Sequence, residues 1–104
     1  MDVCNAAEIP INTGVCALFG DIQVAVFRVG DRLYALENLD PFSRANVIYR
    51  GIIGDRAGIA KVASPVFKQS FDLSTGQCLD DENVSIPPYQ VREENGMVQV
   101  LINT

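Results

Sequence analysis

The sequence predicts an all-β domain, a sandwich or barrel of short antiparallel strands. Apolar residues alternate with polar ones, and no stretch of helix length shows an apolar stripe at helical spacing. Turn signals separate the alternating segments, and five prolines deny much of the remaining chain a helix interior. A length of 104 residues is typical of one domain, so residues 1–104 are expected to form a single domain.

The expected strands follow one another along the chain. The first is VCALFG, and then IQVAVFRV and RLYAL flank a Gly30-Asp31 turn, which predicts a hairpin. The segments IAKVAS and SFDLSTG are two further strands. YQVREENGMVQVLI repeats the alternation around Asn95-Gly96, the strongest hairpin signal in the sequence. Between the two hairpins, PFSRANVIYRGIIGD is compatible with one helical turn.

The charge and cysteine content narrow the choice of partners and compartment. A net charge of -5 makes nucleic acid and anionic membrane surfaces poor partners, because like charges repel. There is no apolar run of membrane-spanning length and no basic, apolar leader at the N-terminus, so we expect a cytoplasmic protein. Cys4, Cys16 and Cys78 have no CxxC spacing and are expected to be free thiols.

The side chains offer no convincing active site. Histidine is absent, which removes the usual base near neutral pH and the commonest nitrogen ligand of metals. The acidic run Asp80-Asp81-Glu82 matches no calcium-loop spacing and is expected to be a solvated surface loop. Asp40 precedes a proline and is expected to start a turn, and Asp72 is expected to cap the turn that Thr75-Gly76 completes by accepting backbone N–H bonds. No catalytic, cofactor-binding or metal-binding residue is therefore predicted.

The stretch SPVFKQSFDLSTGQC resembles the second half of a Rieske iron–sulfur domain. In that family one loop carries Cys-x-His and another Cys-x-x-His; the two Cys hold one iron and the two His the other. Residues 71–76, FDLSTG, match the strand that follows the second loop. By register, Asp40 and Phe42 in the first loop and Ser64 and Phe67 in the second occupy the four ligand positions. The resemblance implies a Rieske-like domain of stacked antiparallel sheets, with two loops at the former cluster site.

A longer pair of segments carries a closer resemblance. LENLDPFSRANVIYRGIIGD and SPVFKQSFDLSTGQCLDDENVSIPPYQVR resemble the small subunit of bacterial NAD(P)H-dependent assimilatory nitrite reductase. This implies a cytoplasmic accessory subunit whose partner is the large subunit of an enzyme that reduces nitrite to ammonia. FAD, an iron–sulfur cluster and sirohaem are then expected on that large subunit, and no cofactor on this chain.

The four replaced ligands lead to two expectations. Serine and aspartate oxygens are poor ligands for a soft cluster and phenylalanine cannot ligate, so no cluster is expected here. We expect Phe42 and Phe67 to pack against each other across the loops, stiffened by Pro41 and Pro65. If the rings are exposed instead, they form an apolar patch suited to a partner. A Rieske ferredoxin that carries electrons and a free-standing binding module remain the alternative functions.

Overall fold

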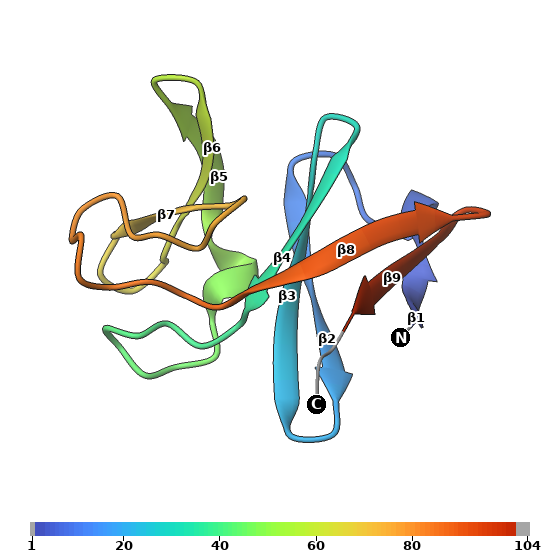
Figure 1. The fold of residues 1–104 in the computed structure, drawn as a ribbon, viewed down its shortest axis with the longest axis horizontal. Helices are drawn as coiled ribbons and strands as arrows, with labels where there is room; N and C mark the ends of the chain where they lie inside the picture. The colour runs from blue at the N-terminus through green and yellow to red at the C-terminus, as the bar shows by residue number, and fades with distance from the viewer. Residues whose placement is uncertain (1, 102–104) are drawn as a thin grey trace.

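The computed structural model describes residues 2–101, which form nine strands and two short 3-10 helices. One antiparallel sheet has the order β1-β9-β8-β4-β3-β2 and a smaller one the order β5-β6-β7 (Figure 1). The larger sheet contains β1 (Asp2–Asn5), β2 (Thr13–Phe19), β3 (Ile22–Val29), β4 (Arg32–Glu37), β8 (Pro88–Glu94) and β9 (Met97–Leu101). The smaller one contains β5 (Ile52–Arg56), β6 (Ile59–Ala63) and β7 (Ser70–Asp72). The 3-10 helices are η1 (Ala6–Glu8) and η2 (Ile48–Arg50).

The predicted all-β class and both predicted hairpins are confirmed. Gly30 and Asp31 join β3 to β4, with Gly30 at a φ of 60°. Asn95 and Gly96 join β8 to β9 with φ of 54° and 81°, the left-handed pair that a type I′ turn requires. No helix among the described residues has the length and apolar character needed to cross a membrane.

Two strands were missed by the sequence reasoning. β1 pairs with β9, and β5 pairs with β6, but neither has a clear apolar alternation. Four of the five residues of β5 are exposed, so backbone pairing rather than burial defines this strand. The helical turn allowed in the same segment is present as η2, immediately before β5.

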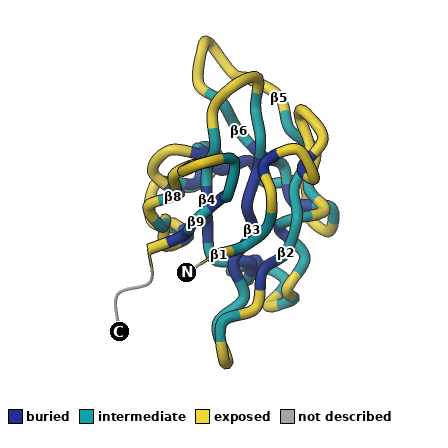
Figure 2. Tube along the Cα trace, turned by 90° about the vertical axis from the view of Figure 1, so that its right-hand side faces the viewer, coloured by how far each residue is buried: buried dark blue, intermediate teal, exposed yellow. Residues whose placement is uncertain are grey.

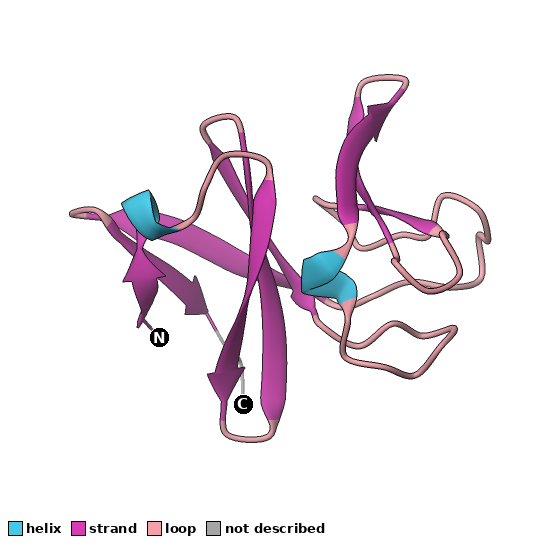
Figure 3. Ribbon diagram, turned by 180° about the vertical axis from the view of Figure 1, so that it is seen from behind, coloured by secondary structure: helices cyan, strands magenta, loops and turns pink. Residues whose placement is uncertain are grey.

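The central strand β3 joins two hydrophobic clusters. Val24 and Val26 contribute to the cluster formed with β9, whereas Ala25 and Phe27 contribute to the cluster beneath the smaller sheet. All four are fully buried, so β3 is covered on both faces. The second cluster also holds Phe71 of β7, so it packs the smaller sheet against the larger one. Buried segments run through the strands, and exposed residues gather at turns and loop tips (Figure 2). Figure 3 shows which segments are strands, helices and loops.

The turn after β7 is closed by the groups predicted from sequence. Asp72 Oδ1 accepts the Ser74 N–H at 2.8 Å, and the Gly76 N–H donates to Asp72 O at 2.7 Å. Burial alone would raise the pKa of the Asp72 carboxyl, but hydrogen bonds from Ser74 and Thr75 together hold that pKa below its usual value. Gly76 has a φ of 79° and lies against the carbonyl of Ile86.

We predict that Gly76→Ala lowers the free energy of unfolding by about 3 kcal/mol or more, because a Cβ would overlap the Ile86 carbonyl oxygen and strain the backbone. Gly58→Ala is the matched control: its φ is 85°, with nothing within 4 Å of the added Cβ. This control should lower the free energy of unfolding by only about 1 kcal/mol. Urea unfolding of both variants checks this, and equal losses would contradict the assigned clash.

Candidate functional site

Two loops meet at one side of the molecule and follow the same path. The first loop comprises residues 40–45 and the second residues 64–69; they lie side by side in Figure 1. In the first, Arg44 N donates to Asp40 O at 2.8 Å, and in the second Lys68 N donates to Ser64 O at 3.1 Å. One further backbone bond closes each loop at its base, from Asp40 N to Ala45 O in the first and from Ser64 N to Gln69 O in the second. The loops therefore repeat one backbone fold with different side chains.

Each loop begins with a side chain that caps its own turn. Asp40 Oδ1 accepts the N–H groups of Phe42 at 2.9 Å and Ser43 at 3.4 Å. Ser64 Oγ accepts the Val66 N–H at 3.3 Å. Short polar side chains favour such turns because they accept a backbone bond two residues ahead. The turn-starting role predicted for Asp40 is confirmed.

A direct hydrogen bond joins the two loops. The Ser64 hydroxyl donates to Asp40 Oδ2, and both residues are fully buried. The Asp40 carboxylate thus accepts bonds on both oxygens, from backbone amides of its own loop and from the hydroxyl of the other. A buried carboxylate is tolerated only when it is satisfied in this way. This Asp40–Ser64 pair holds the loop bases together.

The structure thus brings two of the four predicted ligand positions together, but the expected packing of Phe42 against Phe67 is wrong. The half-buried ring of Phe42 lies against the fully buried Phe71, with centroids 6.2 Å apart. Phe67 exposes 56% of its surface. The reason is geometric: Phe42 is the third residue of its loop and Phe67 the fourth, so a shared backbone path directs them differently.

Two basic residues occupy equivalent left-handed positions. Arg44 has a φ of 66° and Lys68 a φ of 68°, and both are exposed. Residues other than glycine lose about 1–2 kcal/mol in this conformation. Sequence reasoning did not single out these residues, although the parallel between DPFSR and SPVFK, each with Pro second and a basic residue fifth, was a readable signal.

Asn38 supports the first loop from below and was also missed. It is fully buried, and its Nδ2 donates to Asn46 O at 3.1 Å and to Gln23 Oε1 at 3.2 Å. Its Oδ1 accepts the Tyr49 N–H at 2.8 Å. One amide therefore ties β3, the end of the first loop and η2 together. Nothing in a single sequence marks such an asparagine as buried.

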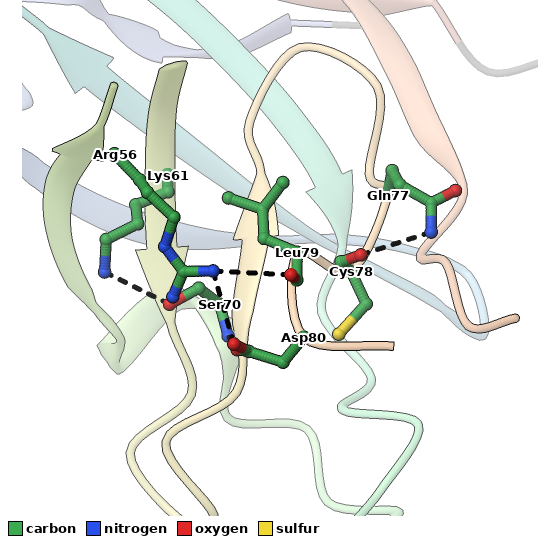
Figure 4. Close-up of polar contacts among 7 residues, drawn as sticks. All are labelled: Arg56, Lys61, Ser70, Gln77, Cys78, Leu79 and Asp80. Carbon is green, nitrogen blue, oxygen red and sulfur yellow. Dashed lines mark hydrogen bonds and ion pairs between the residues drawn. The ribbon is translucent and has the colours of Figure 1, made fainter. Parts of the chain in front are cut away.

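The end of the second loop is anchored by Asp80. Its Oδ2 accepts the Ser70 N–H at 2.8 Å, and its Oδ1 pairs with Arg56 at 3.2 Å (Figure 4). The Ser70 amide and the nearby Arg56 and Lys61 hold the pKa of the Asp80 carboxyl below its usual value, despite partial desolvation. Lys61 Nζ also donates to Ser70 Oγ at 3.1 Å. The acidic run is exposed at Asp80 and Glu82, as expected, but Asp80 also has a structural role that the sequence did not indicate.

None of the three cysteines lies in the two loops, although Cys16 Sγ accepts a hydrogen bond from Asn38 Nδ2 at 3.6 Å. All three are free thiols, as predicted, with Cys78 buried and Cys4 and Cys16 half-buried. Burial raises the pKa of the Cys4 and Cys16 thiols, and Glu8 adds to this at Cys4. A raised pKa keeps a thiol protonated and unreactive near neutral pH.

The residues at the four ligand positions do not fit an iron–sulfur cluster. Such clusters are held by thiolates or, in Rieske centres, also by imidazoles. Here the carboxylate and the hydroxyl are hydrogen-bonded to each other, and the two phenylalanines carry no donor atom. Within residues 2–101 no group of three or more His, Cys, Asp or Glu side chains is placed to hold a metal.

Comparison with known proteins places the fold and the loops in a family. Residues 1–101 match the Rieske-like [2Fe-2S] domain family. The chain is 46% identical to the Escherichia coli K12 nitrite reductase (NADH) small subunit, over 95% of this chain and 94% of the relative. A crystal structure of a Mycobacterium tuberculosis protein proposed to be such a subunit superposes with a TM-score of 0.95, at 44% identity, covering 100% and 96% of the two chains.

A further relative has a different chain organisation. The Klebsiella oxytoca nitrite reductase [NAD(P)H] large subunit is 42% identical over 94% of this chain, which matches 10% of that protein. Together these relatives show that the chain has a Rieske-like domain and belongs to the family of nitrite reductase small subunits.

We predict that Ser64→Ala lowers the free energy of unfolding by about 1–2 kcal/mol, since the Asp40 carboxylate loses a donor and the Val66 N–H loses its acceptor. Asp40→Ala should lose about 3–5 kcal/mol, because two N–H groups and a hydroxyl lose their acceptor. The double variant should lower the free energy of unfolding by less than the sum of the two single losses, and the difference should be at least about 1 kcal/mol. Denaturant unfolding of all four proteins checks this; additive losses would show that the two side chains do not act as a pair.

Proposed function

We propose that this chain is the accessory small subunit of a cytoplasmic NAD(P)H-dependent nitrite reductase, and that it supports the large subunit without carrying a cluster itself. The observation that carries the proposal is the combination of close identity to nitrite reductase small subunits with a loop pair that lacks every cluster ligand. The fold supports membership of the family, and the side chains between the loops support the proposed role.

The role differs from that of an electron carrier. In a ferredoxin the two loops present a redox centre, whereas here Asp40 and Ser64 satisfy each other and Phe42 joins the core. No other described part of the chain offers a ligand set for a cluster. The electrons that reduce nitrite then pass through groups held by the large subunit, for which FAD, an iron–sulfur cluster and sirohaem are expected.

The partner is supported by chain organisation in the relatives. In K. oxytoca a segment similar to nearly all of this chain is part of the large subunit itself. Proteins whose equivalents are joined in one polypeptide are expected to associate, and joining fixes their ratio. One copy of this chain per large subunit is therefore the expected stoichiometry.

The test is reconstitution of nitrite reduction from separately purified subunits. NAD(P)H oxidation and ammonia formation should rise when this chain is added to the cognate large subunit, and should saturate at one chain per large subunit. The chain alone should be inactive. An acidic protein of similar size that is not a relative serves as the control. Full turnover by the large subunit alone, with no binding of this chain, would contradict the proposal.

A further inference from the structure

The tips of the two loops form an exposed surface of unusual composition. We call it the loop-tip surface and define it by Arg44, Val66, Phe67 and Lys68. Val66 is 45% exposed and Phe67 is 56% exposed, adjacent in sequence on the second loop. An exposed phenylalanine next to an exposed valine is an apolar contact area that water solvates poorly.

The loop-tip surface is positive on an otherwise acidic protein. The chain has a net charge of -5, but the only carboxylate within the two loops is the buried Asp40. Ion pairs among the described residues join Arg56 to Asp80 and Arg92 to Glu94, so Arg44 and Lys68 are not neutralised by one. The apolar pair therefore carries basic groups beside it, without acidic ones in the same loops.

The backbone beneath the basic side chains is strained. Arg44 and Lys68 hold left-handed conformations that glycine adopts at no steric penalty. Backbone strain at an exposed position does not improve packing in the core. Such strain is found mostly at functional sites. The same basic charge type at the equivalent position of both loops indicates that these side chains act on something outside the chain.

The loop-tip surface is also pre-organised. The Asp40–Ser64 bond joins the loop bases, and Pro41 and Pro65 restrict the backbone of each loop. A surface that is already ordered loses less conformational entropy on binding than a mobile one. Aromatic residues and arginine are enriched in protein interfaces, and Phe67 and Arg44 present both on a rigid support.

We propose that the loop-tip surface is the docking face for the nitrite reductase large subunit, with Phe67 as the apolar anchor and Arg44 and Lys68 pairing with carboxylates of that subunit. This proposal rests on the proposed function, and it adds which surface of the chain contacts the large subunit and which side chains make the contact. The matching surface of the large subunit is then an apolar pocket bordered by acidic side chains. A second copy of this chain fits poorly tip to tip, because Arg44 and Lys68 would meet their own equivalents.

The experiment measures binding of this chain to the immobilised cognate large subunit at two salt concentrations. Phe67→Ala should weaken binding by about tenfold or more, as loss of an anchor does. Arg44→Glu and Lys68→Glu should each weaken it by about tenfold at low salt and reduce its salt dependence. Lys68→Gly should weaken binding while leaving the Tm unchanged or higher, because it removes a charge and relieves strain together.

Matched controls use exposed apolar residues of the larger sheet. Leu18 is 68% exposed on β2 and Leu101 is 54% exposed on β9, so Leu18→Ala and Leu101→Ala should bind as the parent protein does.

If the parent chain binds and the loop-tip variants bind equally well, the docking face is overturned and the proposed function stands. If the parent chain does not bind, the proposed function fails. Self-association of the chain that Phe67→Ala abolishes would overturn the docking proposal in favour of a second copy.

Discussion

The hydrogen bond from Ser64 to Asp40 is the constraint on which the site depends. It links two residues that are 24 positions apart in sequence and both fully buried. The Asp40 carboxylate also closes its own turn, so one side chain orders a loop and joins it to another. In a cluster-bearing relative of this fold, metal–ligand bonds do the same joining. Here a hydrogen bond between a hydroxyl and a carboxylate joins the loops.

The contacts that hold the two loops together determine which side chains the loops expose. The interior of the loop pair is occupied by Asp40, Ser64 and the inward ring of Phe42, which offer neither a thiolate nor an imidazole. The side chains available for contact with a partner are on the surface, where Phe67 and the two basic residues are exposed. The supporting contacts from Asn38 and Asp80 fix the two loop ends, so the exposed side chains sit on an ordered base. In the proposed role, the chain contributes binding rather than reaction.

Much of the fold could be predicted from the sequence because its signals are local. Asn95-Gly96 and Gly30-Asp31 require positive φ at set places, and the alternation beside them sets which residues face inward. β1 and β5 could not be predicted, because they exist through pairing with distant strands. At the site, motif register predicted four ligand positions, of which the structure brings Asp40 and Ser64 together. The partners of Phe42 and Asp80 depend on tertiary contacts, which no single sequence displays.

The central claim is that hydrogen bonding has replaced cluster ligation between the loops. Iron and acid-labile sulfide analysis of the chain, purified without oxygen from its native source, tests this most directly. We predict neither iron nor sulfide in stoichiometric amount, and no electron paramagnetic resonance signal from a two-iron centre after reduction. Two irons and two sulfides per chain, with such a signal, would contradict the account.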